Sequence, residues 1–309
     1  MTEREALLLP DVADEGAREV LDNLKHFYES HDDIRVMALN GSRVNPSLAS
    51  DKWKDFDVVF FTNDVLRYRH DPAFLTDFGT VLIETEPDSD DGLGEPMYPS
   101  GDGYSYLVQY ISGVRIDFQI MTLSRLEEYL TADRLTMVLG DKDGSLTTAL
   151  PEPSDADYWG SAPTAGLFMT SVKEFWWQAN NVLKENLRGR FLLANQYLTY
   201  VRSELVRLLT WRSGFTVGFE QNFGKAGDEN WPVMSPAERE ALAASFVTSN
   251  HEEIMMAVRR LAALERSASR EVAPLCGVDA GWVEPFAEVP ARFLRSRREE
   301  QWADFFSVQ

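Results

Sequence analysis

Cysteine is nearly absent from this chain of 309 residues, since Cys276 is the only one. A single cysteine cannot form an internal disulfide, and it excludes metal sites built from several cysteines. The four histidines are scattered along the chain without the spacing of zinc ligands: His26, His31, His70 and His251. We therefore expect neither a disulfide-stabilised fold nor a zinc enzyme, and Cys276 is expected to be a small core residue.

Long apolar runs are also missing from the sequence. No stretch approaches the roughly 20 apolar residues that a membrane-spanning helix needs. The first residues lack the basic region and apolar core of a secretory signal. We therefore expect a cytoplasmic protein that does not enter a membrane.

Basic residues are few, with 30 against 50 acidic residues and a formal charge of −20. A negative field of this size repels phosphate backbones and attracts cations. Nucleic acid is therefore not an expected partner. The excess of acid is explained equally well by solubility and by attraction of a cationic substrate.

The length favours two domains, which we expect to cover residues 1–140 and 141–309. The first begins with a helix over about 13–29, where apolar residues recur at helical spacing. Strands follow at 34–39, 55–62 and 80–85, and then a hairpin of 104–111 and 114–122 turns at Ser112-Gly113. This order predicts a mixed sheet with flanking helices.

The second domain is predicted to be an all-α bundle, which makes the protein α+β overall. Apolar and aromatic stripes predict helices over 166–187 and 189–212, the second ending at Ser213-Gly214. Ser235-Pro236 is typical of a capped helix start, as is Asn250 for a helix to about residue 268. A last helix is expected after Pro290.

Two aspartates at the start of the second strand are the first candidates for chemistry. Asp55 and Asp57 share one face of the strand, about 6.6 Å apart along it, while Phe56 faces the other way. Carboxylates held this way repel each other unless a cation lies between them, and Mg²⁺ prefers such oxygen ligands. A solvated strand entrance is the alternative explanation.

A glycine–serine turn precedes this pair by about a dozen residues. Gly41 would let the backbone approach a ligand, and Ser42 with neighbouring N–H groups could hold phosphate oxygens. Arg43 could add a charge-assisted contact. The alternative is an ordinary turn after a strand.

A third aspartate lies in a later strand. Arg115, Asp117 and Gln119 share one face of the strand 114–122, and the apolar residues share the other. An aspartate in a half-buried strand is costly unless it binds something. Either Asp117 joins Asp55 and Asp57, or it forms a structural salt bridge, with Arg115 or with a partner elsewhere.

An acidic stretch lies between Arg69 and Arg115, where the sequence has no lysine or arginine. Within residues 84–102 its acids are Glu84, Glu86, Asp88, Asp90, Asp91, Glu95 and Asp102. They could attract an amine- or guanidinium-bearing substrate, with Glu86 and Asp102 as candidate contacts, or the stretch could be a solvated loop. Trp177 is a further candidate contact, because one helical face cannot bury both Trp176 and Trp177.

These motifs resemble the nucleotidyltransferase superfamily that includes DNA polymerase β. More specifically, they are similar to the bacterial aminoglycoside 6-adenylyltransferases, also called streptomycin adenylyltransferases. The resemblance covers about residues 15–230. It lies in Leu39-Asn40-Gly41-Ser42-Arg43-Val44-Asn45-Pro46, Asp55-Phe56-Asp57-Val58-Val59, Arg115-Ile116-Asp117, Glu174-Phe175-Trp176, Glu204-Leu205-Val206-Arg207, Trp211-Arg212-Ser213-Gly214, Gly218-Phe219 and Gly224-Lys225.

The resemblance implies a magnesium-dependent enzyme that transfers AMP from ATP to a hydroxyl of streptomycin or a related aminoglycoside, which gives antibiotic resistance. Asp55, Asp57 and Asp117 would be the catalytic carboxylates and would bind Mg²⁺, as two ions. The triphosphate would be held by Gly41, Ser42, Arg43 and Lys225, although a surface role for Lys225 stays open.

Two alternatives remain. The same chemistry could act on another small-molecule or protein hydroxyl, or the chain could bind nucleotide without catalysis. Three mutually repelling carboxylates argue against the second. The partners expected are ATP and a cationic aminoglycoside, and the protein would be a monomer or a homodimer.

Overall fold

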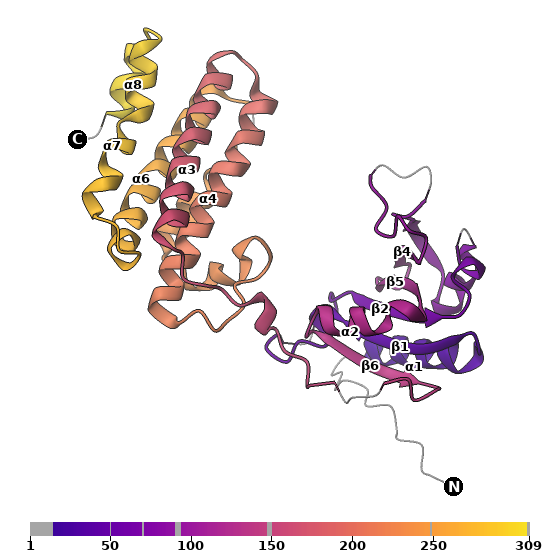
Figure 1. Ribbon diagram of the computed structural model, residues 1–309. Coiled ribbons are helices and arrows are strands. Elements are labelled where there is room, and N and C mark those ends of the chain that lie inside the picture. Colours follow the sequence, from indigo (N-terminus) through magenta and orange to yellow (C-terminus); the bar gives the residue numbers. More distant parts are fainter. Residues whose placement is uncertain are drawn as a thin grey trace. The chain divides into compact units, whose positions relative to one another are not determined.

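The computed structural model describes residues 15–49, 51–69, 71–89, 94–146, 150–247 and 249–307. The chain forms two compact units, Met1–Asp157 and Tyr158–Gln309, which are described separately (Figure 1). The sequence placed the boundary at residue 140, whereas this division lies later. Segment 150–157 packs with the first unit, because the Ser154 N–H donates to the Arg134 carbonyl and Arg134 pairs with Asp157.

The first unit contains a mixed six-stranded sheet, which confirms the predicted class. The strand order is β3-β4-β5-β2-β1-β6, with β2 and β5 parallel and all other neighbours antiparallel. Its main elements are α1 (Glu15–Ser30), β1 (Ile34–Asn40), β2 (Phe56–Thr62), β3 (Val81–Thr85), β4 (Gly103–Tyr110), β5 (Arg115–Thr122), α2 (Leu126–Ala132) and β6 (Thr136–Asp141). Residues 13 and 14, where the first helix was expected to begin, lie outside the described residues.

Two of these elements, α2 and β6, were not predicted. Helix α2 has only seven residues, too few to show a clear helical period. Strand β6 contains Gly140, which weakens the strand signal, and an added Cβ there would lie 2.5 Å from the Tyr28 ring. Both elements therefore depend on packing against the rest of the unit.

The sheet has two differently covered faces. Leu24 and Phe27 of α1 pack with Phe60 and the rest of the larger core on one face. On the other face, α2 contributes Leu126 and Leu130 to a smaller cluster that includes Val59, Phe61 and Met121. Because neighbouring residues of a strand point to opposite faces, Asp57 lies on the same face as Val59 and Phe61.

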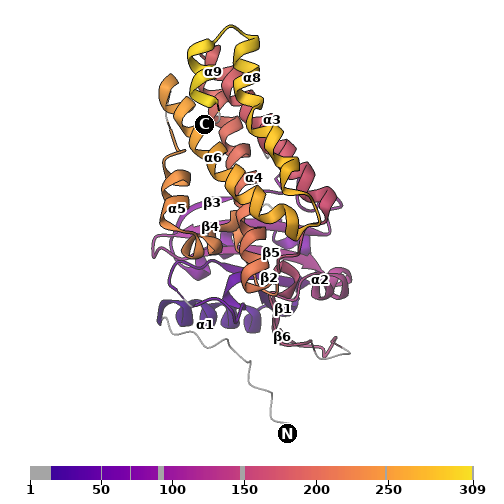
Figure 2. The same cartoon turned by 90° about the vertical axis from the view of Figure 1, so that its left-hand side faces the viewer.

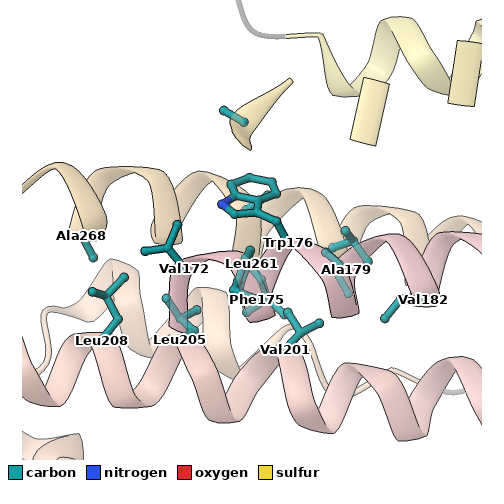
Figure 3. Packing of buried hydrophobic residues seen from close by; sticks show 14 of the residues in the cluster. Val172, Phe175, Trp176, Ala179, Val182, Val201, Leu205, Leu208, Leu261 and Ala268 are labelled. Carbon is teal, nitrogen blue, oxygen red and sulfur yellow. The ribbon is translucent and has the colours of Figure 1, made fainter. Parts of the chain in front are cut away.

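The second unit is helical, as predicted. Its helices are α3 (Ala165–Leu187), α4 (Phe191–Val217), α5 (Pro236–Ala243), α6 (His251–Leu275), α7 (Glu284–Ala287), α8 (Val289–Ser296) and α9 (Glu300–Phe306). Val172 and Phe175 of α3, Val201 and Leu205 of α4 and Leu261 of α6 share one buried core (Figure 3). Helices α8 and α9 pack against each other (Figure 2). None of the helices in the described ranges has the length and apolar content that a bilayer crossing requires.

Helix starts in this unit were predicted better than helix ends. Ser235 and Glu238 form the expected capping box, and the Asn250 side chain accepts from the Glu253 N–H. However, α4 does not stop at Ser213-Gly214 but continues to Val217, so that prediction was wrong. Gly214 is helical, and a Cβ there would lie 2.2 Å from the Phe219 ring; Gly218, at φ 97°, follows the true end. Helix α6 likewise runs seven residues beyond its expected end at 268.

One buried carboxyl stands out in the bundle. Glu265 of α6 is 1% exposed, and its Oε1 has no hydrogen-bond partner among the described residues. Burial raises the pKa of Glu265 to about 8, against smaller lowering effects from the Trp176 indole and the Ser269 hydroxyl. The folded protein therefore holds this group mainly as the neutral acid at pH 7.

Candidate active site

A row of polar side chains crosses three neighbouring strands of the sheet. Asn40 on β1 is paired with Asp57 on β2, and Asp57 is paired with Asp117 on β5. Paired residues on adjacent strands project from the same face, with the strands about 4.8 Å apart. The topology thus brings Asp57 and Asp117 side by side, as expected if their strands were neighbours.

Gly41 lies at the end of β1, directly against Asp57. Its φ is +72°, and an added Cβ would lie 2.3 Å from the Asp57 Oδ2 atom. The left-handed conformation and this close approach both require glycine. The group that approaches Gly41 is therefore a carboxylate of the site itself.

Arg115 links the other two carboxylates. Its guanidinium donates to both oxygens of Asp117, at 2.9 and 2.8 Å, and lies 3.2 Å from Asp55 Oδ2. The hydrogen bond to Asp117 raises the pKa of Arg115. The predicted salt bridge between Arg115 and Asp117 therefore exists, in a site where Asp57 is the next residue across the sheet.

The three aspartates do not form a preformed metal cage. No group of three or more histidine, cysteine or acidic side chains in the described ranges is arranged to hold a metal ion. Nevertheless, Asp57 and Asp117 offer carboxylate oxygens on adjacent strands. Mg²⁺ is usually held by one or two carboxylates together with substrate phosphates and water, so this donor set fits Mg²⁺ that is bound with a nucleotide.

Two cations close the loop between β1 and β2. The Arg43 guanidinium lies 3.9 Å from the centre of the Phe56 ring and donates to the Lys54 carbonyl. The Lys54 ammonium in turn donates to the Ser42 carbonyl at 3.0 Å. Arg43 thus has a structural partner in the loop, and Lys54 is a cation next to Ser42 that the sequence analysis missed.

Glu86 and Asp102 lie away from the row formed by Asn40, Asp57 and Asp117. Glu86 accepts a hydrogen bond from the Tyr104 hydroxyl at 2.5 Å, and Tyr104 belongs to the core on the α1 face of the sheet. Asp102 lies beside Thr122, about 16 Å along β5 from Asp117. The structure therefore does not bring these two acids together with Asp57 and Asp117.

Much of the acidic stretch has structural partners. Asp102 accepts hydrogen bonds from the Ser100 hydroxyl and from the Arg125 guanidinium, and these bonds lower the pKa of Asp102. Asp88 is buried and accepts from the Tyr98 N–H at 2.8 Å. Asp90 and Asp91 lie outside the described residues. The acids with these contacts stabilise local structure. The sequence alone could not distinguish such acids from acids that bind a substrate.

The remaining predicted residues belong to the helical unit. Trp176 is buried in the bundle core and Trp177 is 67% exposed, in line with the expectation that one helical face cannot bury both. Lys225 is exposed and begins the 3-10 helix η6 (Lys225–Val233). The preceding Gly224 lines a groove of about 650 Å³ between α4 and η6, together with Trp231.

Asn40 and Tyr129 were missed as parts of the site. The Asn40 amide bonds the hydroxyl of Tyr129, which α2 places over this face of the sheet. Burial raises the pKa of Tyr129 to about 12, and the charge of Asp57 contributes in the same direction. Asn40 could have been found from its place before Gly41-Ser42, but Tyr129 gave no signal because α2 itself was not predicted.

Comparison with known proteins places the chain. Residues 15–285 match the family model described as Streptomycin adenylyltransferase, so the protein is an enzyme of the nucleotidyltransferase class. In particular, the chain belongs to the streptomycin adenylyltransferase family. This confirms the resemblance that the motifs indicated.

Similar proteins carry corresponding names. An aminoglycoside 6-adenylyltransferase from Campylobacter jejuni is 32% identical over 268 residues, which cover 85% of this chain and 89% of that protein. One from Staphylococcus aureus is 29% identical over 261 residues, covering 84% and 91%. The crystal structure of an aminoglycoside 6-adenyltransferase from Bacillus subtilis shares 23% identity and a TM-score of 0.38, covering 86% of this chain and 97% of that one.

Proposed function

We propose that this protein transfers AMP from ATP to a hydroxyl of an aminoglycoside, with streptomycin as the first candidate, and so confers resistance to the drug. The family and the names of the similar proteins support the substrate class. The observation that carries the chemistry is the pairing of Asp57 with Asp117 on adjacent strands, next to the close approach of Gly41. Because the donor is ATP, we place the protein in the cytoplasm.

The transfer requires positioning and charge neutralisation more than covalent help. The drug hydroxyl attacks the α-phosphorus, the bond to the bridging oxygen of the β-phosphate breaks, and pyrophosphate leaves. The hydroxyl proton passes to a carboxylate, for which Asp117 is our candidate. Asp55, Asp57 and Asp117 would hold Mg²⁺, as two ions, which supplies positive charge to the phosphate oxygens when bound.

The other residues of the proposal orient the nucleotide. Ser42 offers its hydroxyl and backbone N–H at the end of β1, and Lys225 supplies an exposed cation from the helical unit. The N–H of Gly41 donates to the Leu135 carbonyl, so Gly41 contributes by shaping the turn that carries Ser42. Arg43 acts by closing the loop on Phe56 and Lys54. Arg115 pairs with Asp55 and Asp117 and holds both carboxylates in place before the nucleotide arrives.

The acceptor is a polycation, and the protein carries a formal charge of −20. This charge would raise the local concentration of the drug. The contacts of Glu86 and Asp102 favour a structural role for both acids, whereas Trp177 is exposed and stays a candidate contact for the drug.

The experiment is incubation with Mg²⁺, a panel of aminoglycosides and ATP labelled at either the α- or the γ-phosphate. Adenylyl transfer places α-label, and no γ-label, on the drug. Appearance of γ-label on the drug would show a kinase instead. Label on protein, or on no drug in the panel, would overturn the proposed acceptor.

A further inference from the structure

The Asn40 side chain has one end satisfied and the other without a partner. Nδ2 of Asn40 donates to the Tyr129 hydroxyl, while Oδ1 is buried and has no hydrogen-bond partner among the described residues. The nearest residue across the sheet on one side is Asp57, and on the other side it is Thr136. An acceptor without a partner is therefore buried next to a carboxylate, which can also only accept when ionised.

The two ends of a carboxamide have the same shape but opposite hydrogen-bonding character. Turning the amide by 180° presents Oδ1 to the Tyr129 hydroxyl, which can donate as well as accept. The same turn presents the two N–H groups of Nδ2 to the region now occupied by Oδ1. The bond to Tyr129 is kept, and the buried acceptor without a partner becomes a donor in a site rich in carboxylates.

Tyr129 is held in a position from which its hydroxyl can orient the Asn40 amide. Its ring makes an edge-to-face contact with Phe61, at 5.4 Å between ring centres, and its hydroxyl feels the charge of Asp57. Thr136 offers a competing arrangement, because its buried Oγ1 also has no partner among the described residues. A Thr136 hydroxyl that donated to Oδ1 would satisfy Asn40 without any turn of the amide.

We propose that Asn40 is a positioning residue whose amide, oriented by the Tyr129 hydroxyl, donates from Nδ2 toward Asp57 and fixes that carboxylate for the bound nucleotide. The importance of Asp57 rests on the proposed function, whereas the orientation of the amide does not. Asn40 acts through Asp57 and does not touch the reacting atoms.

Three substitutions separate this role from a merely structural one. Asn40→Asp keeps the shape and the acceptors but removes the donor, so it should lower kcat by about a hundredfold, as expected for a displaced reactive group. Tyr129→Phe removes only the hydroxyl and should lower kcat by about tenfold with a small change in KM for ATP. The double variant Asn40→Asp/Tyr129→Phe should be no slower than Asn40→Asp alone, because both act through one device.

Tyr106→Phe is the matched control. Its hydroxyl is also buried and donates at 2.6 Å to the Tyr68 carbonyl, but on the opposite face of the sheet. It should lower the midpoint of thermal unfolding about as much as Tyr129→Phe does and leave kcat unchanged. Near-normal kcat in Asn40→Asp, or a loss in Thr136→Val in place of Tyr129→Phe, would overturn the proposal.

A neutron structure of the deuterated protein shows the orientation of the Asn40 amide directly and does not depend on an activity assay. The proposal requires the deuterium atoms of Asn40 Nδ2 to face Asp57 and the Tyr129 deuterium to face Oδ1. Deuterium atoms of Nδ2 directed at the Tyr129 oxygen would refute it, even if the wild type adenylylates an aminoglycoside. Failure of the drug assay with the proposed amide orientation would refute only the function.

Discussion

Substitution of Gly41 by alanine should disable the site with only a modest loss of stability. Gly41 has a φ of +72°, and the new Cβ would lie 2.3 Å from Asp57 Oδ2 and 3.2 Å from its carboxyl carbon. Carbon and oxygen atoms without a bond between them do not approach so closely. The Asp57 carboxylate or the strand end must therefore move.

The expected size of the effect follows from two separate contributions. The left-handed conformation costs an alanine about 1–2 kcal/mol, which lowers the unfolding midpoint by roughly 2–8 °C in a unit of this size. Moving a reactive group by about 1 Å costs on the order of a hundredfold in rate. We therefore expect kcat to fall by about two orders of magnitude while the protein stays folded at 25 °C.

Gly144→Ala is the matched control for the conformational cost. Gly144 also has a positive φ, +61°, but an added Cβ meets nothing within 4 Å. Its thermal unfolding midpoint should fall by a similar amount, measured by circular dichroism, with the transfer rate unchanged. Wild-type transfer by Gly41→Ala, or an equal loss of transfer in Gly144→Ala, would refute the reasoning.

Three further predictions concern charge. Because the pKa of Glu265 is raised from 4.5 to about 8, the folded state keeps a proton that the unfolded chain releases. This contribution to stability is complete below pH 4.5 and is lost as the pH rises toward 8. Relative to Glu265→Gln, the wild type should lose on the order of 2–3 kcal/mol of unfolding free energy between pH 5 and pH 7. Urea unfolding followed by tryptophan fluorescence tests this, because Trp53 is the only tryptophan before residue 158 and the signal therefore reports mainly on the helical unit. Parallel profiles of stability against pH for the wild type and Glu265→Gln would contradict it. Arg115→Gln should lower the transfer rate. It should also lower the Mg²⁺ concentration for half-maximal rate several-fold, because a cation between two carboxylates is removed. A higher requirement for Mg²⁺ would count against Asp55 and Asp117 as its ligands. Raising the salt concentration should increase KM for the cationic acceptor more than KM for ATP, and equal changes would argue against attraction by the acidic surface.

The alternation of residues along single strands was readable from the sequence. It placed Arg115 and Asp117 on one face and the apolar residues on the other, as the structure has them. It also separated Asp57 from Phe56, although β2 begins at Phe56, one residue after the expected start. Such patterns are local, since they depend only on the two-residue period of a strand.

Contacts between distant segments were not readable in the same way. The parallel pairing of β2 with β5 joins Asp57 to Asp117, which are 60 positions apart, and no local pattern encodes it. The stacking of Arg43 on Phe56 gives Arg43 a loop contact that no local pattern indicated, and its role as a phosphate ligand stays a prediction. Asn40 and Tyr129 were missed because their meeting depends on α2, a helix too short to show a period.

The proposed chemistry depends on the pair of carboxylates on β2 and β5, and Asp57→Asn tests it most directly. The substitution keeps the shape of the side chain and removes one negative charge. Transfer of α-label from ATP to the drug should fall by at least about a thousandfold at saturating Mg²⁺, with the unfolding midpoint nearly unchanged. Asp22→Asn, at an exposed position of α1, should transfer at the wild-type rate. Near-normal transfer by Asp57→Asn would contradict the assignment of the active site.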